Sequence, residues 1–401
     1  MGAVGLLILG GRIWLTNYKQ IFASDLNRGW GILTVLLVVS CAFAQYPQEA
    51  WLGLANLVPF FWLFIALKEL INQPVRLKQL SWVLIVPSLP IVALGFAQLY
   101  LLWDTPPLLE SILGWELIPQ GKPPGRMSSV FIYTNFLAVY LAIAFTLALG
   151  LWLDTWQNIQ QFKAKQSRTL LFLTVILLTD ISGLVLTSSR NAWGLAVISF
   201  MAYALFMGWR WLIWAVTGAA TAILWASFAP GLGGTQLRKV VPAFFWARLS
   251  DQIYDRPVET LRITQWRFCW NLIKERPLFG WGLRNFTPLY EANTNYWFGH
   301  PHSLYLMLSA ETGIISTLLL VGIVGFIMYK AFVSLINWKI DCQASPRHSS
   351  KLIYFSYVIV FLCCILFNLS DVTIFDLRVN TIIWIVLAAV SGIAFPTVNN
   401  Q

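Results

Sequence analysis

Charged residues are scarce in this chain of 401 residues: only 11% are Asp, Glu, Lys or Arg, about half the share of a soluble globular domain. Hydrophobic residues make up 58%, and apolar runs of about 18 residues or more recur along the sequence. The composition excludes a soluble globular protein and predicts an all-α, polytopic integral membrane protein. The net charge is +10, but the basic residues lie at helix ends and in one polar loop. They form no continuous basic face, which argues against a nucleic-acid partner.

Several motifs of cofactor chemistry are missing. The five cysteines show no spacing typical of a metal site or a disulfide framework. No Asp-x-Asp pair is present to hold a divalent ion on a sugar nucleotide, and no P-loop lysine follows the glycines after Pro230. We therefore expect neither a metal nor a cofactor. Met1 to Leu15 holds no evident cleavable signal peptide, and we expect a first span or an interfacial helix there.

The apolar runs predict about eleven (roughly 10 to 12) transmembrane helices, each long enough to cross the hydrocarbon layer. Besides the N-terminal segment, they are Gly29–Ala44, Ala50–Leu70, Leu80–Trp103, Ser129–Leu153, Thr169–Leu186, Ala192–Met207, Trp211–Phe228, Leu304–Tyr329, Leu352–Leu369 and Val379–Ala394. The prediction divides the chain into an N-terminal transmembrane bundle (1–228), a large loop containing helices (229–303) and C-terminal transmembrane helices (304–401).

The orientation follows from basic residues in short loops, which are retained on the cytoplasmic side. Alternate loops are basic, including those with Lys19 and Arg28, with Lys68 and Lys78, and with Arg210. Counting spans from these loops places residues 104–128, 187–191, 229–303 and 370–376 together on the extracytoplasmic side. The sequence therefore predicts one large extracytoplasmic loop, which also carries two of the three histidines.

Arginines near this side of the membrane allow two interpretations. Arg190 sits between two spans with almost no room for a loop, either as a snorkelling or capping residue or as a cation beside a membrane-embedded anion. A helix is predicted between Glu259 and Pro277, because apolar residues recur there at spacings of five, four and three, and Pro277 ends it. It covers the membrane surface, or it points Arg262 and Arg267 at an anionic headgroup, since guanidinium binds phosphate through two hydrogen bonds.

The end of the loop contains the residues best suited to acid–base chemistry. His300 and His302 flank a proline where the loop re-enters the membrane, and histidine is the most common general base near neutral pH. Zinc is a competing interpretation, but no cysteine or carboxylate cluster nearby completes a site. Gly280 and Gly282 predict a turn that lets backbone segments approach closely.

Four short motifs follow one another between residues 187 and 313: Thr187–Arg190, Arg262 with Trp266, Pro277–Gly282 with Phe286, and His300–Tyr305 with Glu311–Gly313. Their order and spacing resemble the O-antigen ligase and polymerase superfamily of bacterial membrane glycosyltransferases. The resemblance implies an enzyme that takes a glycan from undecaprenyl diphosphate and transfers it to an acceptor hydroxyl, inverting the anomeric carbon without a metal. The acceptor is lipid A core, another glycan or a protein.

The resemblance also implies roles for single residues. His302 would be the catalytic base, and Arg190 and Arg262 would bind the donor pyrophosphate with help from Arg267 or Arg256. The supporting residues would be His300, Ser303, Glu311, Gly280 and Gly282. Ser303 departs from the family, which usually has Asn after this histidine, although a hydroxyl can also orient a ring nitrogen.

The implied location is the bacterial inner membrane, with multiple passes, surrounding membrane lipids and the large loop in the periplasm. Two other functions stay open: an inorganic-anion transporter of the bicarbonate type or its accessory protein, and a non-catalytic partner in glycan export. No internal repeat is evident, and basic residues cluster at one surface, which favours the enzyme over a transporter. Ligase, polymerase and protein O-glycosyltransferase are not separated by the sequence.

Overall fold

The computed structural model describes residues 2–158, 164–250, 258–338 and 347–395, which form helices joined by turns, with no strand in these ranges. This confirms the prediction of an all-α, polytopic protein. The contacts divide the chain into two compact units, one made of Met1–Leu80 with Val258–Gln401 and the other of Ser81–Pro257. The division of the chain at residues 228 and 303 concerns membrane topology and stays a prediction.

Eight helical segments of the described chain are long and apolar enough to cross a membrane. They are Asp25–Ala42, Pro47–Leu70, Pro74–Tyr100, Thr134–Gln157, Gln166–Thr187, Arg210–Phe228, Leu304–Ile336 and Leu377–Ala394. Two other predicted spans correspond to shorter apolar helices, Arg190–Phe206 and Lys351–Phe367. The total of about eleven spans therefore stays a prediction.

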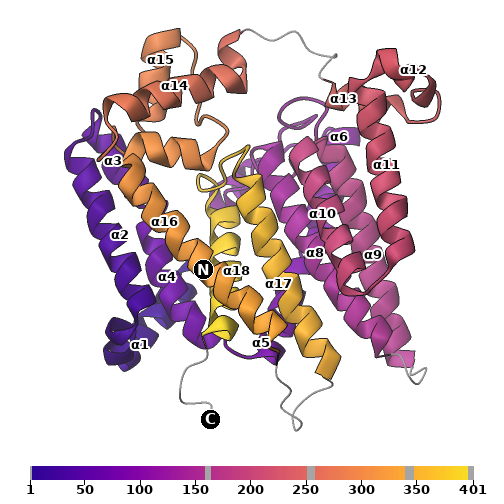
Figure 1. The fold of residues 1–401 in the computed structure, drawn as a ribbon, viewed down its shortest axis with the longest axis horizontal. Helices are drawn as coiled ribbons and strands as arrows, with labels where there is room; N and C mark the ends of the chain where they lie inside the picture. Colours follow the sequence, from indigo (N-terminus) through magenta and orange to yellow (C-terminus); the bar gives the residue numbers. More distant parts are fainter. Residues whose placement is uncertain (1, 159–163, 251–257, 339–346, 396–401) are drawn as a thin grey trace. The chain divides into compact units, whose positions relative to one another are not determined.

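The first unit joins the two ends of the chain (Figure 1). Its helices are α1 (Gly2–Ala23), α2 (Asp25–Ala42), α3 (Pro47–Leu54), α4 (Val58–Leu70), the start of α5 (Pro74–Ile85), α14 (Arg262–Glu275), α15 (Phe286–Thr294), α16 (Leu304–Ile336), α17 (Arg347–Phe367) and α18 (Leu377–Ala394). An aromatic cluster holds three of them together. The ring of Trp30 on α2 lies 4.8 Å from Phe61 and 5.4 Å from Phe64 on α4, and 5.3 Å from Trp384 on α18.

The second unit is organised around the buried helix α8 (Thr134–Gln157), which packs against α9 (Ala164–Thr187) and α10 (Arg190–Phe206). Its first five turns carry no charged residue, so the helix can be apolar on all sides and lie inside the unit. The other helices are α6 (Ser88–Tyr100), α7 (Pro107–Leu113), α11 (Arg210–Phe228), α12 (Gly234–Leu237) and α13 (Ala243–Leu249). α9 ends at Thr187 and α10 begins at Arg190, at the predicted break.

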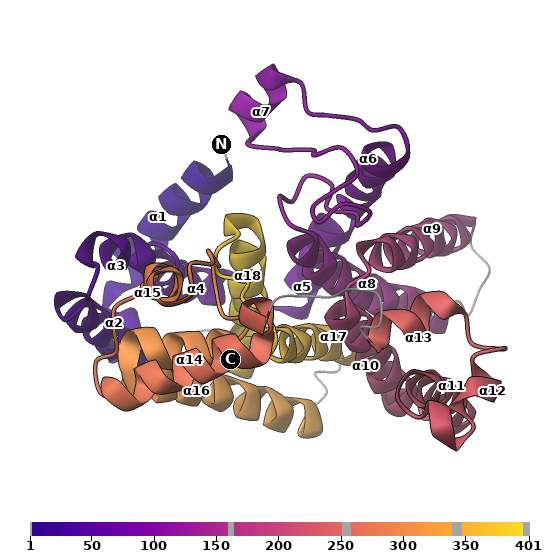
Figure 2. The same cartoon turned by 90° about the horizontal axis from the view of Figure 1, so that it is seen from above.

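The predicted helix before Pro277 is α14, which contacts α15 and α16 in the first unit (Figure 2). Gln265, Cys269, Leu272 and Ile273 are its buried residues, spaced so that they share one face. This face packs on a small core that includes Phe286 and Tyr290 of α15 and Ala310 of α16. α14 and α15 therefore form a fixed cover over the first turns of α16.

The loop between α14 and α15 is joined to α16 by a backbone seam, which we define as residues 277–282 with 310–314. The amides of Trp281 and Gly282 donate to the carbonyls of Ala310 and Glu311 at 3.0 and 2.7 Å, and the amide of Ile314 donates to Pro277 at 2.8 Å. α16 kinks within the seam at Gly313, whose φ of 80° and ψ of 164° suit only glycine. The seam therefore fixes the direction in which α16 leaves the loop.

We predict that Gly313→Ala destabilises the protein by about 2 kcal/mol or more, because a side chain adds backbone strain at this φ. A Cβ atom at this position would also lie 2.0 Å from the carbonyl oxygen of Leu278. The thermal unfolding midpoint in detergent measures the effect. The matched control is Gly322→Ala in the same helix, where a Cβ meets no atom within 4 Å. Equal midpoints for both variants would contradict the role of the seam.

Candidate active site

His300 and His302 lie in the short loop between α15 and α16, and this loop is held at both ends. The indole Nε1 of Trp266 on α14 donates to the carbonyl of Pro301 at 2.9 Å. The amide of Leu304 donates to the carbonyl of Asn368, after α17, at 2.9 Å. His302 has a φ of 52°, an uncommon left-handed conformation for a non-glycine residue. Contacts with α14 and with the turn after α17 therefore hold the loop in place.

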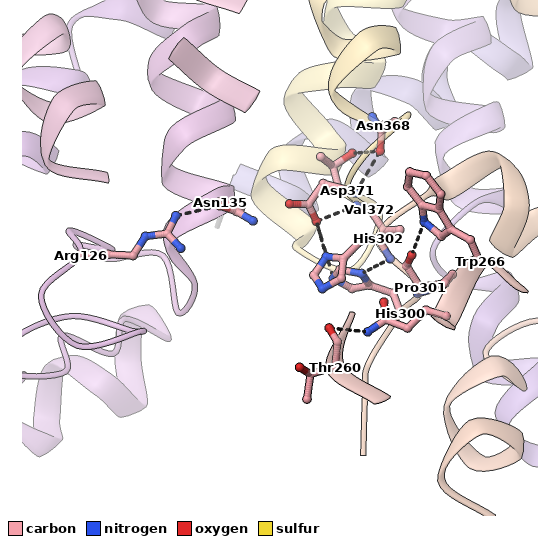
Figure 3. Close-up of polar contacts among 12 residues, drawn as sticks. Arg126, Asn135, Thr260, Trp266, His300, Pro301, His302, Asn368, Asp371 and Val372 are labelled. Carbon is pink, nitrogen blue, oxygen red and sulfur yellow. Dashed lines mark hydrogen bonds and ion pairs between the residues drawn. The ribbon is translucent and has the colours of Figure 1, made fainter. Parts of the chain in front are cut away.

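Both histidines face Asp371, which lies in the turn between α17 and α18 (Figure 3). Asp371 Oδ1 is 3.8 Å from His300 Nε2 and 3.7 Å from His302 Nδ1. The two imidazole rings meet edge to face with centroids 4.7 Å apart, and His300 stacks on Phe375. We call His300, His302 and Asp371 the His–Asp cluster.

The turn that carries Asp371 is hydrogen-bonded internally. The Asp371 carboxylate accepts from the amide of Val372 at 2.9 Å, and the side-chain carbonyl of Asn368 accepts from the amide and hydroxyl of Thr373. The Asp371 side chain is only 3% exposed. A carboxylate this deeply buried has to be neutralised or paired, and the two imidazoles are its partners here.

The environment sets the charge of two members of the cluster. Burial lowers the pKa of His300 to about 4, assisted by His302 and by the charge of Arg262 and opposed by Asp371. Burial works toward a higher pKa for Asp371, but the contact with His302 and the charges of both histidines outweigh it and lower that pKa. Near neutral pH the cluster therefore contains a neutral His300 and an ionised Asp371.

The cluster is also a possible metal site, because its nitrogen and oxygen ligand atoms all lie within 4.8 Å of one another. The sequence argument against zinc rested on the lack of a nearby carboxylate, and Asp371 corrects that premise. Hydrogen bonding still argues against a metal. The amide of His302 donates to His300 Nδ1 at 3.2 Å, so the single proton of the neutral ring resides on Nε2. In this tautomer the atom that faces Asp371 has no lone pair for a metal.

Two of the predicted phosphate-binding arginines lie on α14. Arg262 is the first residue of this helix, and its charge makes a small contribution to the lowered pKa of His300. Arg267 is exposed five residues later, about 140° around the helix axis from Arg262. The two side chains therefore leave different faces of α14. The pyrophosphate role of either arginine stays a prediction, and Arg256 lies outside the described residues.

Arg190 belongs to the second unit, where it starts α10 and donates to the carbonyl of Leu249 at 3.4 Å. Its convergence with His302 stays a prediction. A second arginine, Arg126, contacts the same helix break and is drawn with its partner Asn135 in Figure 3. Its Nε donates to the carbonyl of Thr187 at 2.8 Å, and its guanidinium also donates to Asn135 at 3.2 Å. The break between α9 and α10 therefore has two cations close to it within its own unit.

The supporting residues have mostly structural contacts. A Cβ atom on Gly280 would lie 2.4 Å from the backbone of Glu311, so this glycine allows the seam to close. Gly282 donates across the seam, and the buried Glu311 carboxylate accepts from the amide of Phe286 at 3.0 Å. Ser303 is buried at the start of α16, and its side chain makes no cap hydrogen bond. Their predicted functional roles are untested by these contacts.

The sequence did not predict that Asp371 faces the two histidines or that Arg126 contacts the break between α9 and α10. Asp371 lies almost 70 residues after His302, and no local motif connects them. One signal was present, since residues 370–376 were placed on the same side of the membrane as the histidines. That placement does not separate Asp371 from Asp376, the other acid of the same loop. Arg126 lies in a long Pro- and Gly-rich loop, where a single basic residue carries little information.

One family model matches part of the chain. No curated protein matches the chain. Residues 172–321 match the family model described as O-antigen ligase, a range that includes Arg190, Arg262, the backbone seam and both histidines of the cluster. Asp371 lies beyond the end of the match. The match confirms the predicted resemblance: residues 172–321 of this multi-pass membrane protein are similar to the O-antigen ligase family, which supports the O-antigen ligase/polymerase superfamily.

Proposed function

We propose that the protein is an inverting, metal-independent glycosyltransferase that moves a glycan from undecaprenyl diphosphate to an acceptor hydroxyl on the periplasmic side. The observation that carries this proposal is the pairing of the buried Asp371 with His302, which lies inside the range that matches the O-antigen ligase family. The match to this family does not favour the transporter that the sequence left open. Lipid A core, another glycan and a protein remain the acceptor classes to be distinguished by experiment.

His302 is the base in this mechanism. Its Nδ1 faces Asp371 at 3.7 Å, so an N–H at Nδ1 would interact with the carboxylate and leave the lone pair of Nε2 for the acceptor. The contact is longer than a regular hydrogen bond, and such contacts commonly shorten in the reacting complex. As the acceptor oxygen attacks the anomeric carbon, its proton passes to Nε2, and the negative charge of Asp371 stabilises the imidazolium that forms.

Besides a base, the reaction needs a positive charge close to the leaving group. The bond between the anomeric carbon and the diphosphate oxygen breaks as the new glycosidic bond forms, and undecaprenyl diphosphate departs with added negative charge. A preformed cation in a site with little water stabilises that charge most effectively. Arg262 is the candidate in the first unit, because it lies at the start of α14 and its charge contributes to the lowered pKa of His300. Arg190 is the second cation of the proposal.

We predict that deleting the gene makes the lipid-linked glycan accumulate, and that wild-type protein but not His302→Ala restores transfer. Loss of the base removes the acceptor for the hydroxyl proton, an effect of about 100-fold or more on rate. The glycan profile also assigns the acceptor: loss of lipid-A-attached glycan indicates a ligase, and collapse to single repeats indicates a polymerase. His348→Ala, which removes the remaining histidine, is the control. Unchanged glycans with altered carbon uptake would favour the transporter instead.

Arg262 should hold the diphosphate of the bound donor as well as stabilise it when it leaves. We expect Arg262→Ala to raise the KM for the lipid-linked donor by about tenfold or more, because a charge-assisted bond to phosphate contributes roughly 1.5 to 3 kcal/mol. Transfer by purified protein in detergent, measured against donor concentration, gives this value. Arg267→Ala on another face of the same helix is the matched comparison. A normal donor KM together with a normal kcat for Arg262→Ala would remove this arginine from the mechanism.

A further inference from the structure

His300 is in contact with both other members of the His–Asp cluster, although the proposed mechanism uses it for neither binding nor proton transfer. Its Nδ1 accepts the amide N–H of His302 at 3.2 Å, and its Nε2 faces Asp371 Oδ1 at 3.8 Å. The ring is 13% exposed and stacks on Phe375 at 6.1 Å with an interplanar angle of 14°. One ring nitrogen of His300 therefore contacts the backbone of the proposed base, and the other faces the carboxylate that pairs with this base. In this position His300 can control the orientation of His302 relative to Asp371.

We propose that His300 is a positioning residue that fixes the backbone of His302 through Nδ1 and orients Asp371 through Nε2. This inference rests on the proposed role of His302 as the base. It assigns the two ring nitrogens separate tasks, which different amide side chains can replace one at a time. It also explains why a histidine suits this position, because the ring has an acceptor and a donor on the two sides that the cluster needs.

The first task follows from the backbone of His302. A left-handed φ of 52° is unfavourable for a non-glycine residue, so the conformation needs support from its surroundings. The hydrogen bond from the His302 amide to His300 Nδ1 gives that support inside the loop itself. Without it, His302 can relax toward ordinary backbone angles, and its ring then leaves the position opposite Asp371.

The second task follows from the tautomer of His300. Because Nδ1 accepts a hydrogen bond, the proton of the neutral ring is on Nε2 and points toward Asp371. That N–H lies 3.8 Å from the same oxygen that His302 approaches at 3.7 Å. His300 therefore restrains the carboxylate from one side while leaving its charge available to His302. A protonated His300 would lose the acceptor at Nδ1, which connects this role to the neutral form of the ring.

Three substitutions separate the tasks. His300→Asn keeps an acceptor near the Nδ1 position, His300→Gln keeps a donor near the Nε2 position, and His300→Phe keeps only an aromatic ring to stack on Phe375. We expect His300→Phe to lower kcat for transfer about 10- to 100-fold, as loss of an outer partner of a functional histidine does. The donor KM and the thermal midpoint should stay near the wild-type values. His300→Asn and His300→Gln should each recover part of kcat.

A double-mutant cycle with Asp371 tests whether His300 acts through the cluster. If it does, His300→Phe lowers kcat far less in an Asp371→Asn background than in the wild type. Independent, multiplying effects would overturn the inference, and so would a normal kcat for His300→Phe. A lowered thermal midpoint with no partial recovery by either amide would assign His300 a purely structural role. The proposed function fails separately, if His302→Ala transfers glycan normally.

Discussion

A buried negative charge is the constraint on which the site depends. Asp371 is almost fully enclosed, so its carboxylate needs partners, and the first unit places two imidazoles within 4 Å of it. This pairing matters for function because an imidazole can give and take a proton near neutral pH, whereas a guanidinium cannot. The contact also joins two segments far apart in the chain, the turn after α17 and the loop before α16.

The fold around the cluster limits how these two segments can move. The seam between residues 277–282 and 310–314 sets the kink of α16, and His302 lies just before the first turn of that helix. Trp266 ties the intervening Pro301 to α14, which is itself packed on α15 and α16. Hydrogen bonds to the backbone and close glycine contacts therefore hold the loop that carries the histidines, and the side chains of His302 and Asp371 carry the proposed chemistry.

Local patterns predicted much of this arrangement. Apolar runs predicted the helices, Pro277 marked the end of α14, and the pair Gly280 and Gly282 indicated the close backbone approach that the seam shows. The contact between His302 and Asp371 could not be predicted in this way, because it depends on how α16, α17 and α18 pack and not on any spacing along the chain. The left-handed backbone of His302 was likewise invisible, since its support comes from a ring nitrogen of His300.

The most direct test of this account is the steady-state kinetics of purified Asp371→Asn with the lipid-linked donor. Asparagine keeps the shape of the side chain but removes the charge that faces His302, so the account predicts a kcat lower by about 100-fold or more with a nearly unchanged donor KM. Transfer at the wild-type rate by a folded Asp371→Asn protein would contradict the central claim that this carboxylate makes His302 a base.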